Sequence, residues 1–165
     1  MAWLAESSSP APQNPVDSLE QIVSANEWPF ERLGEDEIAF GVAGTNAQYQ
    51  LWFGWHEDSG ALEFRRAFDL GVPDRRYADV CEVLARVNQQ LWIGHFEASP
   101  KDAQVTFRHT TLIGPGATQP NLETLVEVAL AACDRCYPAF MLLLWGGKKP
   151  EDAVAAAMLE TVGEA

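Results

Sequence analysis

Three successive stretches of this sequence, at 38–42, 48–56 and 61–70, alternate apolar and polar residues, and only short turns separate them. In the middle stretch, for example, Leu51 and Phe53 occupy alternate positions with polar or small residues between them. Side chains of a β-strand point alternately to its two faces, so each stretch predicts a strand with one buried face. Turns this short join antiparallel neighbours, because parallel strands need a long crossover. The sequence therefore predicts an antiparallel sheet.

Helical patterns precede, interrupt and follow these strands. Asn14 is a suitable N-cap for a first helix that begins directly after it. A second helix at 73–91 leads into a strand at 93–98 with almost no linker, and a return strand follows at 104–113. The predicted order is helix, four strands, helix, two strands, long helix and short helix. This order predicts an α+β fold, in which helices flank an antiparallel sheet of five to six strands.

The stretch 79–97 joins the second helix to its strand, between the first strands and the returning pair. Apolar residues recur in this helix at the spacing of one helical face: Tyr77, Val80, Cys81, Leu84, Val87 and Leu91. An apolar stripe of this kind packs on a hydrophobic core. We therefore expect the second helix to cover one face of the sheet, with its whole stripe, Cys81 included, turned toward the core.

The chain is acidic, with a formal net charge of −13 over 165 residues. Lys and Arg neutralise the phosphates of nucleic acids and of anionic membranes, so this charge argues against both as partners. Three cysteines do not make a disulfide framework and favour the cytoplasm, where thiols stay reduced. The N-terminal residues lack the features of a signal peptide, and no apolar run reaches the roughly 20 residues that span a bilayer.

A single domain accounts for most of the chain. Residues 1–15 are rich in Ser, Pro and Ala, which predicts a disordered N-terminal tail. Trp3 and Leu4 are apolar residues of that tail, and they have either no role or the role of a short docking motif. Residues 16–163 form the predicted domain, which is long enough to bury a core without a disulfide or a metal.

The histidines offer one candidate metal site. His95 and His109 lie on neighbouring predicted strands and could approach each other, with Glu97 nearby. Two imidazoles and a carboxylate are a minimal set of metal ligands. A hydrogen-bonded histidine pair explains the same residues without a metal, and the absence of HExxH and HxH patterns favours it. A third interpretation is a sensor of small ligands, with Arg66 and Arg108 as contacts for an anion.

The sequence carries no recognisable catalytic or cofactor motif. GxSxG, SxxK and P-loop patterns are all absent. Cys133 and Cys136 match CxxC, but both fall in the middle of a predicted helix on its apolar stripe, which favours buried thiols over a redox or zinc site. We therefore predict a non-enzymatic protein with no catalytic residues, no cofactor and no resident metal. An uncharacterised enzyme is the alternative.

The tryptophans are the more informative residues, since six in 165 is a high number. Trp52 lies on the polar face of its predicted strand, and Trp92 and Trp145 each lie at the end of an element. Exposed aromatic residues are enriched in binding surfaces. Together with Ile93, these tryptophans are the predicted partner-binding residues. A second layer of helices on the sheet, or a homodimer, would bury the same residues.

Several segments, taken together and in order, resemble the YbjN family of bacterial proteins. They are NEWPFE at 26–31, YQL at 49–51, LWIGHF at 91–96 after Asn88, and WGGK at 145–148 before Pro150, Glu151 and Ala153. The resemblance extends from about residue 16 to residue 163. It lies in the joint order of the segments, since none of them is chemically diagnostic alone.

The resemblance implies a fold like that of the type III secretion chaperones, which is an antiparallel sheet flanked by helices and is commonly dimeric. Members of the family are labelled sensory transduction regulators, and the family provides no catalytic residues to carry over. We accordingly expect a cytoplasmic homodimer that binds another protein or a peptide segment in a chaperone-like way, with a role in bacterial signalling or stress regulation. Apolar grooves and exposed aromatic residues would receive the segment.

Overall fold

The structure is a computed structural model, and it describes residues 14–44, 48–113 and 119–160. Its elements, in chain order, are α1 (Pro15–Ala25), β1 (Phe30–Arg32), β2 (Glu37–Ala43), β3 (Gln48–His56), the short 3-10 helix η1 (Glu57–Ser59), β4 (Ala61–Phe68), η2 (Asp74–Arg76), α2 (Tyr77–Asn88), β5 (His95–Ser99), β6 (Gln104–Leu112), α3 (Gln119–Leu144) and α4 (Pro150–Glu160). The predicted α+β class and the order of the elements are confirmed. Residues 1–13 of the predicted tail at 1–15 lie outside the described residues, whereas Pro15 begins α1. The sequence also predicts a turn at 44–46 and a loop at 114–120. Residues 45–46 and 114–118 lie outside the described residues, and Gln119 and Pro120 begin α3.

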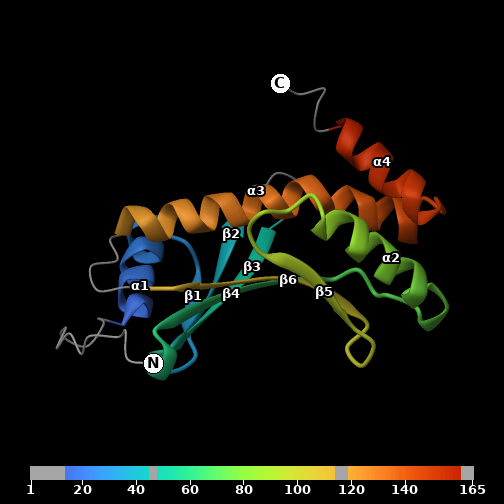
Figure 1. The fold of residues 1–165 in the computed structure, drawn as a ribbon. Coiled ribbons are helices and arrows are strands. Elements are labelled where there is room, and N and C mark those ends of the chain that lie inside the picture. Colours follow the sequence, from blue (N-terminus) through green and yellow to red (C-terminus); the bar gives the residue numbers. More distant parts are fainter. Residues whose placement is uncertain (1–13, 45–47, 114–118, 161–165) are drawn as a thin grey trace, which may run out of the picture.

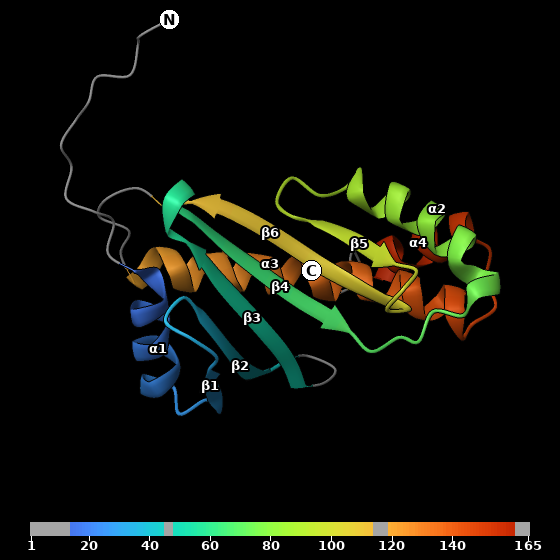
Figure 2. The same cartoon turned by 90° about the horizontal axis from the view of Figure 1, so that it is seen from below.

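The strands form one antiparallel sheet in the order β1-β2-β3-β4-β6-β5 (Figure 2). The first four strands follow one another as neighbours, as the short turns predict. β6 then lies between β4 and β5, with Phe64 opposite His109 on one side and Phe96 opposite Phe107 on the other. The sequence predicted that β5 and β6 pair with each other, but not which of the two lies next to β4. Because β6 is the strand next to β4, β5 is an edge strand and β6 is an interior strand.

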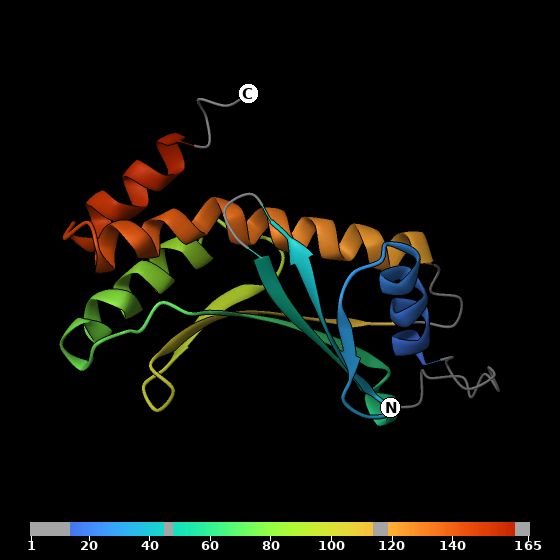
Figure 3. The ribbon, with the colours of Figure 1, turned by 180° about the vertical axis from the view of Figure 1, so that it is seen from behind.

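One face of the sheet carries the core. Neighbouring rings on this face lie 5.0–6.0 Å apart between centroids, in the sequence Phe40, Phe53, Phe64, Phe107 and Phe96 across the strands. α3 runs over these rings along the length of the sheet, and α1 covers the end near β1 and β2 (Figures 1 and 3). Aromatic pairs at this spacing contribute about 0.5–1.5 kcal/mol each beyond their burial. The sheet and its helices therefore form two layers around one core.

The ends of the helices follow local signals in the sequence. The Asn14 side chain accepts a hydrogen bond from the backbone N–H of Val16 at 2.9 Å, which satisfies a free donor at the start of α1. At the end of α3, Gly147 has a φ of 64°, and the N–H of Lys148 donates to the carbonyl oxygen of Leu142 at 3.1 Å. Glycine adopts this left-handed conformation without the steric cost of a Cβ atom. The predicted start of the first helix directly after Asn14 is confirmed.

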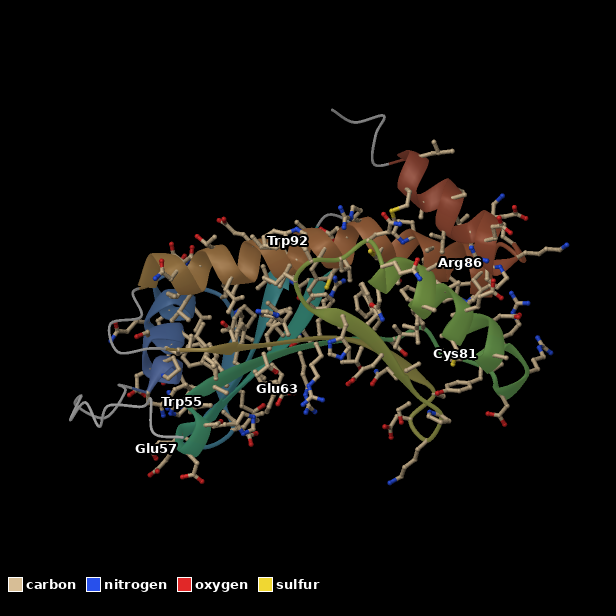
Figure 4. The ribbon with its side chains drawn as sticks, viewed as in Figure 1. Trp55, Glu57, Glu63, Cys81, Arg86 and Trp92 are labelled. Atoms are coloured by element: carbon tan, nitrogen blue, oxygen red, sulfur yellow. The ribbon has the colours of Figure 1, made fainter. Side chains whose placement is uncertain are left out.

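The second helix does not lie where the sequence predicted. α2 packs against β5, α3 and α4 at one end of the sheet, and α3 covers the sheet face instead (Figure 2). Its buried side chains are Val80, Val83, Leu84 and Val87, whereas Cys81 is exposed (Figure 4). The predicted burial of Cys81 was therefore wrong. The stripe is rotated because α2 contacts two helices and a strand edge rather than a flat sheet.

Among the described residues, no helix combines the length and the apolar character that a bilayer crossing requires.

Candidate functional site

The second face of the sheet, here called the open face, carries no helix in the part of the chain that the structure describes (Figures 1 and 3). A row of paired residues crosses it from strand to strand: Ala39, Trp52, Arg65, Arg108 and His95. Beside this row lies a groove with a volume of about 680 Å³, whose lining includes Gln50, Trp52, Arg65, Glu97, Gln104 and Thr106. A helix-free, hollowed sheet face is the first candidate for a binding surface.

Trp52 lies in this groove and is held in place on three sides. Its indole lies against Gly54, where a Cβ atom would be 2.3 Å from the ring. Its indole N–H donates to a carboxylate oxygen of Glu37 at 3.3 Å, and the guanidinium of Arg65 lies 5.1 Å from the ring centroid. A cation over an indole is attracted by the negative face of the ring. Trp52 is therefore a fixed, half-buried aromatic surface within the groove.

Glu63 is a buried carboxylate on the open face. Its side chain is only 3% exposed, although no described helix covers it. Arg65 and Arg108 each place Nε 2.6 Å from its Oε1 atom, and His56 Nε2 lies 3.2 Å from Oε2. Burial raises the pKa of Glu63, but hydrogen bonds from Arg65 and His56 and the charges of both arginines outweigh it, so the pKa is lowered overall.

The charged network continues to the edge of the sheet. Glu97 on β5 lies 3.5 Å from His95 Nε2 and 4.0 Å from a terminal nitrogen of Arg108. Arg108 therefore forms ion pairs with both Glu63 and Glu97, and these pairs link β4, β6 and β5. Groups that are already paired in this way position neighbouring side chains, and they are poorly suited to act as a free acid, base or nucleophile.

The predicted metal set is divided between the two faces. His95 is the partner of Arg108 on the open face, whereas His109 is the partner of Phe64 on the core face. Burial lowers the pKa of His109, and the charge of nearby His95 lowers it further. The described residues contain no group of three or more His, Cys, Asp or Glu side chains that could hold a metal ion. The described residues proposed as metal ligands therefore do not converge on one site.

The two arginines that were candidates for anion binding are also on opposite faces. Arg66 is buried on the core face, with its guanidinium carbon 3.4 Å from the ring centroid of Tyr49 and 4.2 Å from that of Phe68. One terminal nitrogen of Arg66 lies 3.9 Å from a carboxylate oxygen of Asp134 on α3. Arg108 belongs to the Glu63 network on the open face. The structure therefore does not bring these two arginines together.

The other predicted partner-binding residues lie away from the groove. Trp92 is 85% exposed in the loop between α2 and β5, which rises beside α3 on the helical side of the sheet (Figure 4). Ile93 follows it and is half-buried. Trp145 is 60% exposed and lies directly after α3. Of the four predicted residues, only Trp52 lines the groove.

The CxxC cysteines are core residues. Cys133 and Cys136 are both buried within α3. Burial raises the pKa of Cys133 to about 12, and the neighbouring Arg66 offsets only part of that effect. Burial likewise raises the pKa of Cys136. Both thiols are therefore protonated at neutral pH, which agrees with the packing role predicted from their place on the apolar stripe.

Comparison with known families identifies the chain. A family model described as YbjN, putative bacterial sensory transduction regulator, matches residues 15–141. The chain belongs to the YbjN family. This description is regulatory and names no enzymatic activity. A search of curated proteins found no match.

The fold is also that of a solved YbjN protein. The crystal structure of YbjN from E. coli, described as a putative transcription regulator, aligns with a TM-score of 0.53 and 11% sequence identity. The alignment covers 95% of this chain and 96% of that chain. At this identity the likeness establishes the shared YbjN fold across nearly the whole length and does not extend to individual site residues.

Sequence reasoning did not find the Glu63 network. The alternation in 61–70 puts Glu63 and Arg65 on the face opposite its apolar residues, but it does not give their partners on other strands. A signal was present, since opposite charges two residues apart in a strand share one face. The partners Arg108 and His56 come from β6 and β3, and only the strand order brings Arg108 beside β4.

Proposed function

We propose that this YbjN protein is a non-enzymatic regulatory domain that binds another protein, or a peptide segment of one, through its open face. The observation that supports the proposal is the groove of about 680 Å³ on a sheet face that the described helices leave uncovered, with Trp52 fixed inside it. Aromatic side chains in grooves with polar surroundings are frequent anchors of protein interfaces. The rest of the lining includes Gln50, Gln104 and Thr106, which can pair with a peptide backbone.

The edge of the sheet beside the groove favours binding on the face over strand addition. The Asn88 side chain of α2 accepts a hydrogen bond from the backbone N–H of Phe96 at 2.8 Å and donates one to the carbonyl oxygen of Phe96 at 2.9 Å. The hydroxyl of Tyr77 donates to the carbonyl oxygen of Ala98 at 3.2 Å. These side chains occupy backbone groups that an added strand would need on β5. A chaperone-like partner segment would therefore lie across the face of the strands.

A cytoplasmic location and a homodimer belong to the same proposal. The three cysteines, Cys81, Cys133 and Cys136, are all free thiols, which suits a reducing compartment. A second copy of the chain is one protein that could cover the open face or the exposed Trp92 and Trp145. Native mass spectrometry of the purified chain measures the oligomeric state and any bound small molecule together.

The test places a photo-crosslinking amino acid at Gln50, which lines the groove beside Trp52 and leaves that side chain unchanged. The matched control carries the same amino acid at Glu82, an exposed position on α2. We expect the groove position alone to capture a defined protein in bacterial cells. The purified partner should then bind the Trp52→Ala variant at least about tenfold more weakly, which corresponds to about 1.4 kcal/mol.

Equal binding of that partner to wild type and to Trp52→Ala would contradict the proposal for the open face. Parallel measurements on Trp92→Ala and Trp145→Ala show whether these exposed tryptophans contribute to the same interface. A bound metabolite in the native mass spectrum, with no crosslinked protein, would favour a small-ligand sensor instead.

A further inference from the structure

The helical side of the sheet contains a separate cavity. α1, β2 and the first half of α3 border a space of about 370 Å³. Its apolar lining includes Leu19 and Ile22 of α1, Phe40 and Val42 of β2, and Val126 and Leu130 of α3. Ligand pockets in proteins have volumes of roughly 300–1,000 Å³. The space is therefore large enough for a bulky side chain from outside the domain.

Apolar surface connects this cavity to the edge of the sheet. Trp28 borders the cavity, and its ring stacks on that of Phe40 with 6.1 Å between centroids. Phe30 of β1 is the register partner of Phe40, so both lie on the same sheet face. Phe30 is nevertheless 40% exposed. An exposed aromatic residue beside an apolar cavity is typical of a docking surface.

The surroundings of the cavity are strongly acidic. Glu123 and Glu127, one turn apart on α3, are exposed and line its mouth. Asp17, Glu20 and Glu27 lie in or just after α1, which borders the cavity, and Arg32 is the single basic residue of 14–44. Arg32 is already paired with Asp17 at 2.9 Å and with Glu20 at 2.7 Å. The local field therefore attracts a positively charged partner.

We propose that this cavity docks a peptide segment of a partner protein in which a bulky apolar side chain is flanked by Lys or Arg. The apolar side chain would fill the space above Phe40 and Val42, and the flanking cations would face Glu123 and Glu127. The site lies on the other side of the sheet from the open face, so the inference stands independently of the function proposed above.

The N-terminal segment of this chain is the competing occupant. It contains Trp3 and Leu4, which have the required apolar character. Residues 1–13 contain no Lys or Arg, however, and include Glu6. Like charges at an interface oppose association. Charge complementarity therefore favours a basic segment from another protein.

The full-length chain is titrated with a synthetic peptide that carries one Trp between pairs of Lys in a Gly/Ser background. NMR spectra of the chain are recorded at each peptide concentration. A control peptide has Glu in place of every Lys. We expect chemical shift changes at Trp28 and Val126 but not at Trp52. The Lys peptide should bind at least about tenfold more tightly than the Glu peptide, and this preference should shrink as salt is added.

Two variants distinguish the contribution of the apolar cavity to peptide binding from that of the acidic residues at its mouth. Val126→Phe fills the apolar space, and the double variant Glu123→Gln/Glu127→Gln removes the rim charge at exposed positions where folding is not at risk. Each should weaken binding of the Lys peptide about tenfold or more, whereas Trp52→Ala should leave it unchanged. Thermal unfolding of each variant verifies that it is folded.

Four results would overturn the proposal. The first two are equal affinity for the Lys and Glu peptides, and an affinity for the Lys peptide that is the same in the double Gln variant as in wild type. The other two are chemical shift changes confined to parts of the chain away from the cavity, and no chemical shift change at Trp28 with millimolar Lys peptide. A variant lacking residues 2–13 tests the competing occupant. Unchanged affinity supports the partner segment, and a rise of tenfold or more assigns the cavity to the N-terminal segment of the chain itself.

Discussion

Replacing Glu63 by Gln keeps the shape of a buried side chain and removes the charge on which two guanidinium groups converge. Hydrogen bonds to charged groups contribute about 1.5–3 kcal/mol, and breaking a buried ion pair costs about 3–5 kcal/mol. The side chains of Arg65, Arg108 and His56 are 45%, 37% and 54% exposed, so water can solvate them again after the substitution. We therefore expect Glu63→Gln to lower the free energy of unfolding by about 2–3 kcal/mol at pH 7.

Urea unfolding followed by tryptophan fluorescence measures this difference. For a domain of this size, each kcal/mol shifts the melting temperature by about 2–4 °C, so the variant should melt about 4–12 °C lower. Glu97→Gln is the matched control, because Glu97 is on the same face but is 44% exposed and has only longer contacts with His95 and Arg108. Its effect should stay within about 0.5 kcal/mol.

The pH dependence provides a second check on the same residue. The pKa of Glu63 in the folded protein is lowered from 4.5, so its charged form stabilises the fold. That contribution is complete well above pH 4.5 and is lost as the pH falls through the folded pKa. The difference between wild type and Glu63→Gln should therefore shrink below pH 4.5. A variant as stable as wild type at pH 7, or a difference that stays constant down to pH 3, would refute the reasoning.

Three further outcomes follow from buried groups. Arg66→Met retains contact with the flanking rings and removes a buried terminal nitrogen whose ion pair with Asp134, at 3.9 Å, is too long for a hydrogen bond. The free energy of unfolding in urea should therefore change by less than about 1.5 kcal/mol, whereas Arg66→Ala leaves a cavity and should cost about 2–4 kcal/mol. Thiol alkylation of the native protein should label Cys81 rapidly and Cys133 only after unfolding, and rapid native labelling of both would contradict the burial. Gly94→Ala should lower stability by more than about 3 kcal/mol in thermal unfolding, because Gly94 has a φ of 66° and a Cβ atom would lie 2.2 Å from the Phe107 ring. Gly71→Ala, at a φ of 55° with free space around it, is its control and should cost only about 1–2 kcal/mol.

Local patterns were sufficient for much of the fold. The alternation in 48–56 predicted both the limits of β3 and its buried face, because the two-residue period of a strand is a property of the backbone. Asn14 predicted the start of α1 because capping involves only neighbouring residues. The sequence left open whether Trp92 and Trp145 are exposed or covered, and the structure shows both exposed.

The candidate site was predictable only in part. The sequence placed Trp52 on the polar side of its strand, and it lies there in a groove. It also brought His95 near His109 through the β5–β6 hairpin, but the two side chains are on opposite faces. A shift of one residue in register reverses every side chain of a strand, and the register of a hairpin is not encoded in its composition.

The sequence by itself determined the class of the fold, the order of its helices and strands and, through the joint order of its segments, the YbjN family. These depend on periodicity, capping and turn chemistry, which act over a few residues. Only the tertiary structure decided that β6 lies between β4 and β5, that α3 rather than α2 covers the core face, and that none of the described helices covers the open face. The Glu63 network and the acidic cavity beside α1 depend on those decisions, since each combines side chains that packing alone brings together from elements far apart in the chain.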